Sequence, residues 1–273
     1  MKPIRVGSSF DIKNMEKIPI LKFEYYEQVL RLKELERDVA TSKARMGAIA
    51  EGRLDKYEDS AWEFAQQEEF NASSQLLNLK YQISKTKIVE INEAVKPKVV
   101  RLGVIVKLKD INKNVEKNYF IGSINNEDRL SINSPLAHQL LGKKINQEFK
   151  LTTPGGSIRY SISEIKWGLK DYLEKYLSKY IQKEITNIEK INSKISLNDP
   201  RILTVPADAN RESHAEILQK KNFLNNIGNR IEYVLTMINE YDIKITESKQ
   251  CKLILEKIKN LFEKSSISYS PLF

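Results

Sequence analysis

The sequence has 273 residues, of which 41% are hydrophobic and 30% are charged, and its formal net charge is +9. This composition is typical of a folded, helix-rich protein of two or three domains and excludes an intrinsically disordered chain. Runs of about eighteen apolar residues and the apolar core of a signal peptide are missing, and one cysteine, Cys251, excludes an intrachain disulfide. We therefore expect a cytoplasmic protein with no membrane partner.

The positive charge is concentrated in the middle of the chain. Residues 80–167 carry 16 basic and 8 acidic side chains, whereas residues 1–79 carry 12 and 14. Such a basic segment indicates contact with nucleic acid or with an acidic protein surface. Simple solvation of the surface is the alternative interpretation.

Two long helices are predicted between residues 18 and 86. In both, one face repeats with alternating spacings of three and four residues, which is typical of a heptad seam. The seam positions are Tyr25, Gln28, Leu32, Leu35, Val39, Ser42, Met46 and Ile49, then Trp62, Ala65, Glu69, Ala72, Leu76, Leu79 and Ile83. A short polar loop between them predicts an antiparallel coiled-coil arm about 40–45 Å long, and a rigid spacer or dimerisation element is the alternative.

Charged side chains crowd the loop at the end of this arm. They are Glu51, Arg53, Asp55, Lys56, Glu58 and Asp59. Asp55 as a helix N-cap and Glu58 in the first turn would satisfy the helix dipole, which is a purely structural interpretation. Carboxylates at the end of a rod can instead share a hard cation such as Mg²⁺ inside a partner protein.

Residues 87–167 are predicted to form a small α/β domain. Its expected strands are Lys87–Ile91, Val99–Leu108, Asn118–Ile124, Gln147–Thr152 and Ile158–Ile165, with a short helix at Pro135–Leu141. Pro135 suits a first helical turn, Gly142 ends the helix, and 154–156 mark a hairpin turn. His138 has no cysteine or histidine nearby in the sequence, so we expect no metal role for it.

Two motifs resemble the bacterial transcript-cleavage (Gre) factors. Residues 134–144, SPLAHQLLGKK, followed by TPGG at 153–156, resemble the helix and hairpin of that family's C-terminal domain. Upstream, residues 48–69, AIAEGRLDKYEDSAWEFAQQEE, resemble the tip of the family's helical arm. Asp55 and Glu58 match the two tip carboxylates of the family. Asp59 stands where the family has Asn, and the loop before Asp55 is shorter.

The chain is expected to be an α+β protein in four parts: an N-terminal tail at 1–17, a coiled-coil arm at 18–86, a globular domain at 87–167, and a helical extension at 168–273. The resemblance covers about residues 18–167, and it implies that the domain at 87–167 is an FKBP-like Gre domain. It also implies that the arm enters the secondary channel of bacterial RNA polymerase, where the factor stimulates the polymerase's own cleavage of the backtracked nascent RNA 3′ end. The chain is then no enzyme by itself, takes no small-molecule substrate, and is expected to act as a monomer.

The same resemblance assigns roles to individual residues. Asp55 would help to hold a Mg²⁺ ion shared with the polymerase, and Glu58 would orient or deprotonate the attacking water. Arg53, Lys56 and Asp59 are candidate contacts to RNA or polymerase, with simple charge balance as the alternative. A second group, at the channel rim, comprises Ser134, Pro135, Lys143 and Lys144. For its two lysines a solvated helix end is the alternative.

Three amphipathic helices are predicted in the extension. Apolar spacing marks them over 169–195, 224–241 and 251–262, and Asn198-Asp199-Pro200 breaks the first. We interpret Cys251 as a packing residue. The extension is expected to be a stabilising bundle, a partner-binding module, or a regulatory element that holds the arm in a non-productive orientation.

Two other functions compete with transcript cleavage. The extra acid Asp59 and the shortened loop also fit a Gre-like protein that enters the same channel and inhibits the polymerase. A scaffold protein with vestigial tip acids is the third hypothesis. Asp55 and Glu58 discriminate among them, because cleavage needs both, inhibition needs charge alone, and a scaffold needs neither.

Overall fold

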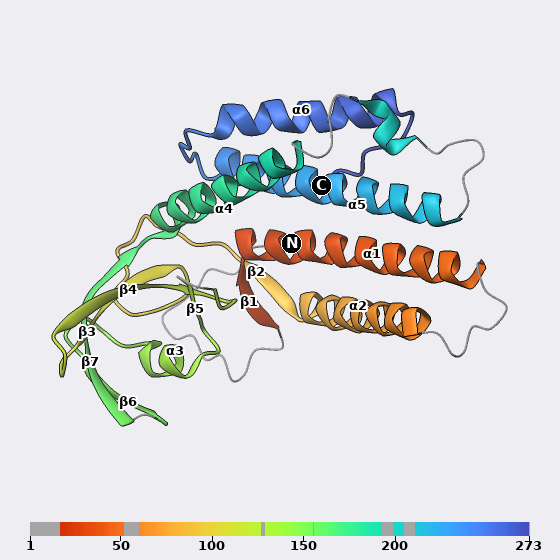
Figure 1. Ribbon diagram of the computed structural model, residues 1–273. Helices are drawn as coiled ribbons and strands as arrows, with labels where there is room; N and C mark the ends of the chain where they lie inside the picture. Colours follow the sequence, from red (N-terminus) through yellow and green to blue (C-terminus); the bar gives the residue numbers. More distant parts are fainter. Residues whose placement is uncertain are drawn as a thin grey trace. The chain divides into compact units, whose positions relative to one another are not determined.

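The computed structural model describes residues 17–51, 60–126, 129–154, 156–192, 199–204 and 211–272 (Figure 1). Contacts divide the chain into two compact units. Unit 1 comprises Met1–Tyr25 and Ser84–Leu173, and unit 2 comprises Tyr26–Ile83 and Glu174–Phe273. Each unit combines two separate stretches of the chain, whereas each predicted domain is one continuous stretch. The predicted domain boundaries therefore stay predictions.

Unit 1 is built on a five-stranded sheet with the order β5-β4-β3-β7-β6. Its strands are β3 (Val104–Asp110), β4 (Val115–Gly122), β5 (Arg129–Ser131), β6 (Glu148–Thr153) and β7 (Gly156–Trp167). Neighbouring strands are antiparallel except β4 and β5, which run parallel. The helix α3 (Pro135–Leu140) contributes Ala137 and Leu140 to the core, and neither is exposed.

A separate two-stranded sheet lies at the base of the helical hairpin, where the chain enters the first helix and leaves the second. β1 (Ile18–Leu21) leads into the first hairpin helix, β2 (Thr86–Val89) follows the second, and the two strands pair in parallel. The register runs from Ile18 opposite Thr86 to Leu21 opposite Val89. The hairpin therefore leaves and re-enters unit 1 at neighbouring strands.

The second half of the strand predicted at Val99–Leu108 is present in β3, where burial alternates along the strand. Val104, Val106 and Leu108 are at most 1% exposed, whereas the residues between them are half-buried. The strand expected from Val99 was wrong for its first five residues. Gly103 has a φ of +85°, and Val100 is paired to the end of α3, with its N–H on the carbonyl of Lys143. This stretch is a loop that closes over α3.

Unit 2 is helical. It contains most of α1 (Lys22–Glu51), α2 (Ser60–Ser84) and most of α4 (Leu169–Asn192), together with α5 (Arg211–Glu240), α6 (Ser248–Lys264) and a short 3₁₀ helix at Pro200–Leu203. The three helices predicted in the extension are confirmed as α4, α5 and α6, and their starts and ends differ from the apolar runs by several residues. None of the helices within the described ranges is long and apolar enough to cross a membrane.

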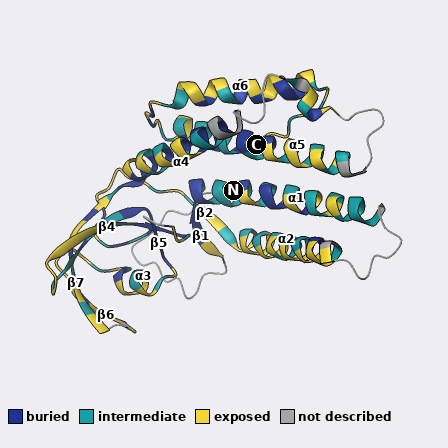
Figure 2. Ribbon diagram, viewed as in Figure 1, coloured by how far each residue is buried: buried dark blue, intermediate teal, exposed yellow. Residues whose placement is uncertain are grey.

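The hairpin helices bury the predicted seam. All seven seam positions of α2 are buried or half-buried, while Phe64, Phe70, Leu77 and Tyr81 on its other sides are at least 64% exposed (Figure 2). On α1, Leu35 and Val39 are the most buried seam positions. The helical hairpin is confirmed. Coiled-coil packing of its two helices stays a prediction.

Candidate functional site

Ion pairs join the distal halves of the two hairpin helices. Arg45 Nη1 lies 2.8 Å from Glu68 Oε2, and Lys43 Nζ lies 3.8 Å from Glu69 Oε1. Nearer the base, Lys80 Nζ lies 3.1 Å from Glu36 Oε1. Each pair bridges α1 and α2, so the ends of the helices that flank the predicted tip are held together, although surface pairs of this kind contribute little stability.

The predicted tip residues belong to residues 52–59, which lie outside the described part of the chain. They are Arg53, Asp55, Lys56, Glu58 and Asp59. Their roles therefore stay predictions, and the structure adds the two helix ends that carry them, Glu51 and Ser60. Within the described residues, His, Cys, Asp and Glu side chains form no group of three that could hold a metal ion.

The second predicted group lies around α3. The Ser134 hydroxyl oxygen accepts a hydrogen bond from the Ala137 N–H at 3.2 Å, and Pro135 follows as the first helical residue. Gly142 has a φ of +80° and ends the helix. These residues shape the turn. Ser134 and Pro135 therefore have a structural role whatever they contact.

The two lysines after α3 differ in exposure. Lys144 is exposed, and its N–H donates to Gln147 Oε1 at 2.8 Å. Lys143 is half-buried, with its Nζ 6.0 Å from the centre of the Phe149 ring and its carbonyl bound to the N–H of Val100. Lys144 is thus the more accessible of the two for a partner. That either lysine binds a partner stays a prediction.

A buried carboxylate fixes the start of α1 within unit 1. Glu24 is 0% exposed, and its oxygens accept from the N–H groups of Leu21, Ser123 and Ile124 at 2.8–3.2 Å. Arg129 Nε lies 3.5 Å from Glu24 Oε1, and the side chain of Arg129 is 2% exposed. A Cβ on Gly122 would lie only 2.5 Å from Glu24 and from Arg129, so glycine leaves room for this cluster.

Aromatic rings complete this anchor. The Arg129 guanidinium lies 5.3 Å from the centre of the Phe23 ring and 6.0 Å from that of Tyr172, and Tyr172 stacks on Phe120 at 4.2 Å. This anchor was not predicted from the sequence. Its two charged members are 105 residues apart, and no local pattern connects them.

Comparison with known proteins identifies the family. The family model described as transcription elongation factor, GreA/GreB, C-term matches residues 95–167. Transcription elongation factor GreA of Vibrio vulnificus is 31% identical over 159 residues, which is 56% of this chain and 99% of that protein. The chain belongs to the GreA/GreB family of transcription elongation factors. GreA of Caulobacter vibrioides is 28% identical over 162 residues and is also covered to 99%.

Among solved structures, GreA factor homolog 1 (Gfh1) of Thermus thermophilus is 21% identical to this Gre-family chain. The match covers 55% of this chain and 98% of that one, with a TM-score of 0.27. The two GreA relatives are matched almost completely by little more than half of this chain. The C-terminal helices lie outside the residues that the family model matches.

In this Gre-family protein the C-terminal helices pack on α1. Arg230 of α5 donates from Nε to Glu34 Oε1 at 2.6 Å and from Nη1 to Glu184 Oε1 of α4 at 3.2 Å. Burial opposes the charge of Arg230, but the hydrogen bond and charge of Glu34, with that of Glu184, raise its pKa. The arginine therefore stays charged and ties three helices together.

Asparagines recur on the side of α5 that meets α1 and the C-terminal residues. Asn222, Asn225, Asn226 and Asn229 recur at helical spacing on it. Asn222 Nδ2 donates to Thr41 Oγ1 at 2.9 Å, and Arg37 Nη1 donates to Asn226 Oδ1 at 2.7 Å. We call this surface, with Arg230 and Tyr233, the asparagine face. The apolar spacing of α5 predicted its other side and not the asparagine face, although the recurrence of Asn is visible in the sequence.

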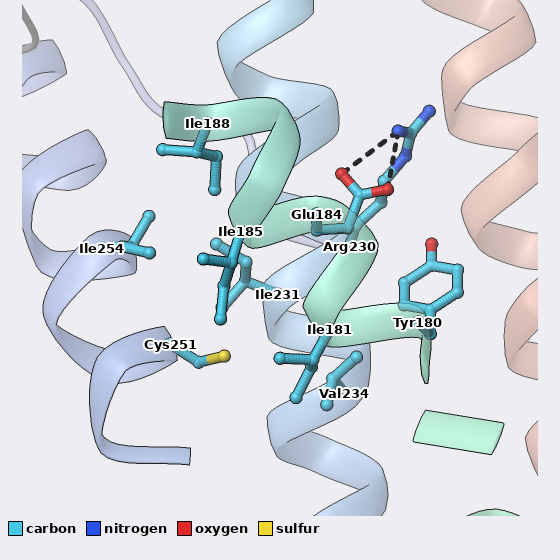
Figure 3. A pocket seen from close by; sticks show the side chains of 10 residues that line it. All are labelled: Tyr180, Ile181, Glu184, Ile185, Ile188, Arg230, Ile231, Val234, Cys251 and Ile254. Carbon is cyan, nitrogen blue, oxygen red and sulfur yellow. Dashed lines mark hydrogen bonds and ion pairs between the residues drawn. The ribbon is translucent and has the colours of Figure 1, made fainter. Parts of the chain in front are cut away.

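The opposite face of α5 is apolar. Leu224, Ile227, Ile231 and Val234 are each at most 4% exposed. Ile231 and Val234 meet Ile181, Ile185 and Ile188 of α4, and Cys251 and Ile254 of α6, around a gap of about 10 Å³ (Figure 3). The gap is smaller than a drug-sized ligand site by more than an order of magnitude, so it is a packing defect of the core.

Cys251 is confirmed as a packing residue, because it is 1% exposed and its thiol lies in this apolar interior (Figure 3). Burial, with a smaller contribution from the charge of Glu247, raises the pKa of its thiol to about 11. A protonated, buried thiol is a poor nucleophile and a poor metal ligand.

Proposed function

We propose that this protein binds RNA polymerase through the secondary channel and stimulates the polymerase's intrinsic cleavage of the backtracked RNA 3′ end. The observation that carries the proposal is the match to GreA of Vibrio vulnificus over 99% of that relative. A helical hairpin whose two helices flank the acidic segment 52–59 supports it. In this proposal the hairpin is a coiled-coil arm, and the sheet of unit 1 is an FKBP-like domain that docks at the channel rim.

The chemistry proposed for the tip is a division of labour between two carboxylates. Asp55 helps to hold a Mg²⁺ ion that the polymerase also ligates, and Glu58 orients the attacking water and accepts its proton. Mg²⁺ in a two-metal site supplies charge stabilisation for phosphodiester cleavage. One or two exposed carboxylates bind Mg²⁺ weakly by themselves, so the protein assists the enzyme and is not one itself.

The remaining predicted residues have supporting roles in the proposal. Arg53, Lys56 and Asp59 contact RNA or the channel wall, and Lys143 and Lys144 contact the rim. Each of these contacts is proposed from the family resemblance and from the exposure of Lys144. The protein acts as a monomer in the cytoplasm.

RNA cleavage in stalled, backtracked elongation complexes tests the proposal. We expect wild-type protein to accelerate release of the 3′ fragment, and Glu58→Gln to lower the rate about 100-fold or more at saturating Mg²⁺. Asp55→Asn is expected to raise the Mg²⁺ concentration needed for half-maximal rate. Glu63→Gln, an exposed acid in the first turn of α2, is the matched control and is expected to keep the wild-type rate. Equal rates with and without wild-type protein contradict the proposal.

One observation favours inhibition as the second candidate function. Asp59 adds a third acid within five residues, next to Asp55 and Glu58. An inhibitor is expected to slow nucleotide addition on complexes that are not backtracked, and Asp59→Asn is expected to relieve that slowing. Unchanged nucleotide addition rules the inhibitor out.

A further inference from the structure

The two faces of α5 differ in chemistry. Its apolar face packs against α4 and α6, with four side chains at most 4% exposed. The asparagine face meets α1 through hydrogen bonds and ion pairs: Tyr233 with Glu27, Arg230 with Glu34, Asn226 with Arg37, and Asn222 with Thr41. Polar contacts fix a register and can be exchanged for water, whereas apolar contacts cannot. Although Tyr233 is 0% exposed, the α1–α5 seam is the more polar of the two interfaces of α5, so we expect it to separate first.

Residues 270–272, which we call the strap, form hydrogen bonds to both helices of this seam. The Ser270 N–H donates to Asn225 Oδ1 and the Leu272 N–H to Glu232 Oε2, which holds the strap to α5. Lys33 Nζ donates to the carbonyl of Pro271 at 2.6 Å, and Arg37 Nη2 to that of Ser270 at 3.3 Å, which holds it to α1. The links from α1 come from long, partly exposed side chains to carbonyls, so water can replace these hydrogen bonds when they break.

The contacts between α5 and α1 follow one register over the first two thirds of α1. Pairs from Glu27–Tyr233 to Thr41–Asn222 show that the helices are antiparallel, and the 14 steps from Glu27 to Thr41 span about 21 Å. Beyond these pairs α1 continues for ten residues to Glu51, and α5 extends for eleven residues back to Arg211. The two helices run side by side in Figure 1. α5 thus flanks α1 up to the end from which the acidic segment 52–59 follows.

We propose that the C-terminal helices are a releasable cover of the arm, and that the arm acts on the polymerase only after α5 has left α1. This inference rests on the proposed function. A hairpin is two helices wide, about 20 Å, and α5 adds a third helix along one flank. The flank that a partner cavity must contact is then occupied by the chain itself.

The cover stays tethered when it opens. α4 begins in unit 1, where Tyr172 stacks on Phe120 and lies 5.9 Å from the ring of Phe23. The apolar interior holds α4, α5 and α6 together as one piece. When α5 leaves α1, only the contacts of the asparagine face and the strap have to break. Because the helices stay attached through α4, α5 can return to α1 without a diffusional encounter.

A cross-link across the seam tests the cover. In the full chain with Cys251→Ala, which removes the single native cysteine, Thr41→Cys and Asn222→Cys are joined by a short bismaleimide. The matched control joins Arg45→Cys to Glu68→Cys, a pair that ties α1 to α2 and leaves α5 free. Each variant is also capped with a monofunctional maleimide to separate the effect of substitution from that of the link. Cleavage of backtracked RNA and binding to the polymerase are measured for all four.

We expect the seam cross-link to lower cleavage and polymerase binding at least tenfold relative to its capped form, and the hairpin cross-link to leave both unchanged. Seam-linked protein that binds and cleaves like its capped form overturns the inference and makes α5 a permanent third helix of the arm. If no form stimulates cleavage, the proposed function fails. Polymerase binding then still decides the cover: lower binding of the seam-linked form supports it, and equal binding overturns it.

Discussion

Two glutamates of α1 are paired with arginines, and the two pairs differ in how firmly they hold the helix. We call the Glu24–Arg129 pair the anchor and the Glu34–Arg230 pair the clasp. Glu24 is 0% exposed and accepts from three backbone N–H groups besides facing Arg129. Glu34 relies on side chains, and its partner Arg230 is 30% exposed. Backbone donors cannot rotate away, whereas a partly exposed arginine can turn to water. The base of α1 is therefore fixed in unit 1, while its middle is held by contacts that can be released.

The largest expected effect is at the anchor. Glu24→Ala leaves Arg129 and three N–H groups buried without their carboxylate, so we expect the free energy of unfolding of unit 1 to fall by about 3–5 kcal/mol. Urea denaturation measures it. Glu36→Ala is the control, because its pair with Lys80 is about half exposed and is expected to contribute less than about 1 kcal/mol. Equal losses in the two variants would remove the distinction between anchor and surface pair.

The pH dependence of stability probes Cys251, which lies in the apolar interior between α4, α5 and α6. The pKa of Cys251 is raised from 9.0 to about 11 in the folded chain, so the thiol favours folding fully below pH 9. That contribution declines as the pH rises from about 9 to about 11, because the unfolded chain ionises first. We expect wild type to lose about 2–3 kcal/mol of stability over this range relative to Cys251→Ala. Parallel pH profiles of the two proteins would show that Cys251 titrates normally.

The clasp is expected to tolerate damage better than the anchor. Arg230→Met removes the hydrogen bonds to Glu34 and Glu184, whose side chains are 9% and 7% exposed. Because Arg230 is itself partly solvated, we expect a loss of only about 1–2 kcal/mol in urea denaturation of unit 2. Arg201→Met, which breaks the exposed pair with Asp199, is the control and should cost less. A loss at Arg230 as large as at Glu24 would make the seam a second anchor.

The smallest expected loss of stability, in Asn222→Ala, tests most directly whether α5 must leave α1 before the protein acts. Asn222→Ala removes hydrogen bonds to the carbonyl of Arg37 and to Thr41 Oγ1, so we expect about 1 kcal/mol less stability of the seam. That shift favours the released state by about fivefold and raises cleavage at limiting protein concentration by a similar factor. Asn71→Ala, on the exposed side of α2, is the control. Cleavage that falls in Asn222→Ala would contradict release as the activating step.

Local sequence patterns predicted the long elements and missed two of the short strands. The spacing of apolar residues found the hairpin helices and all three helices of the extension, because a helix repeats its pattern over many turns. β1 and β5, with four and three residues, carry too few repeats to be recognised. The loop before β3 reads as strand because Val99 and Val100 are β-branched, and only their contact with the turn after α3 decides otherwise.

Sequence motifs offer candidate site residues where the chemistry is local, and none where it depends on distant pairs. Asp55 and Glu58 stand out because acids crowd a short segment, and their roles stay predictions. The Glu24–Arg129 anchor and the Glu34–Arg230 pair join residues 105 and 196 positions apart. A single sequence does not show such pairs, because many surface glutamates and arginines look alike until tertiary packing selects two of them.

The parallel pairing of β1 with β2 has a consequence for the order of folding. Ile18 and Thr86 are 68 residues apart, and the whole hairpin lies between them. Closing so long a loop is entropically costly until α1 and α2 have already met, because the hairpin shortens the effective separation of its ends. The two-stranded sheet is thus expected to form late, after the hairpin zips. In pulsed hydrogen exchange during refolding, we expect the amides of β1 and β2 to become protected after those of α1 and α2, so their protection reports when the arm is complete.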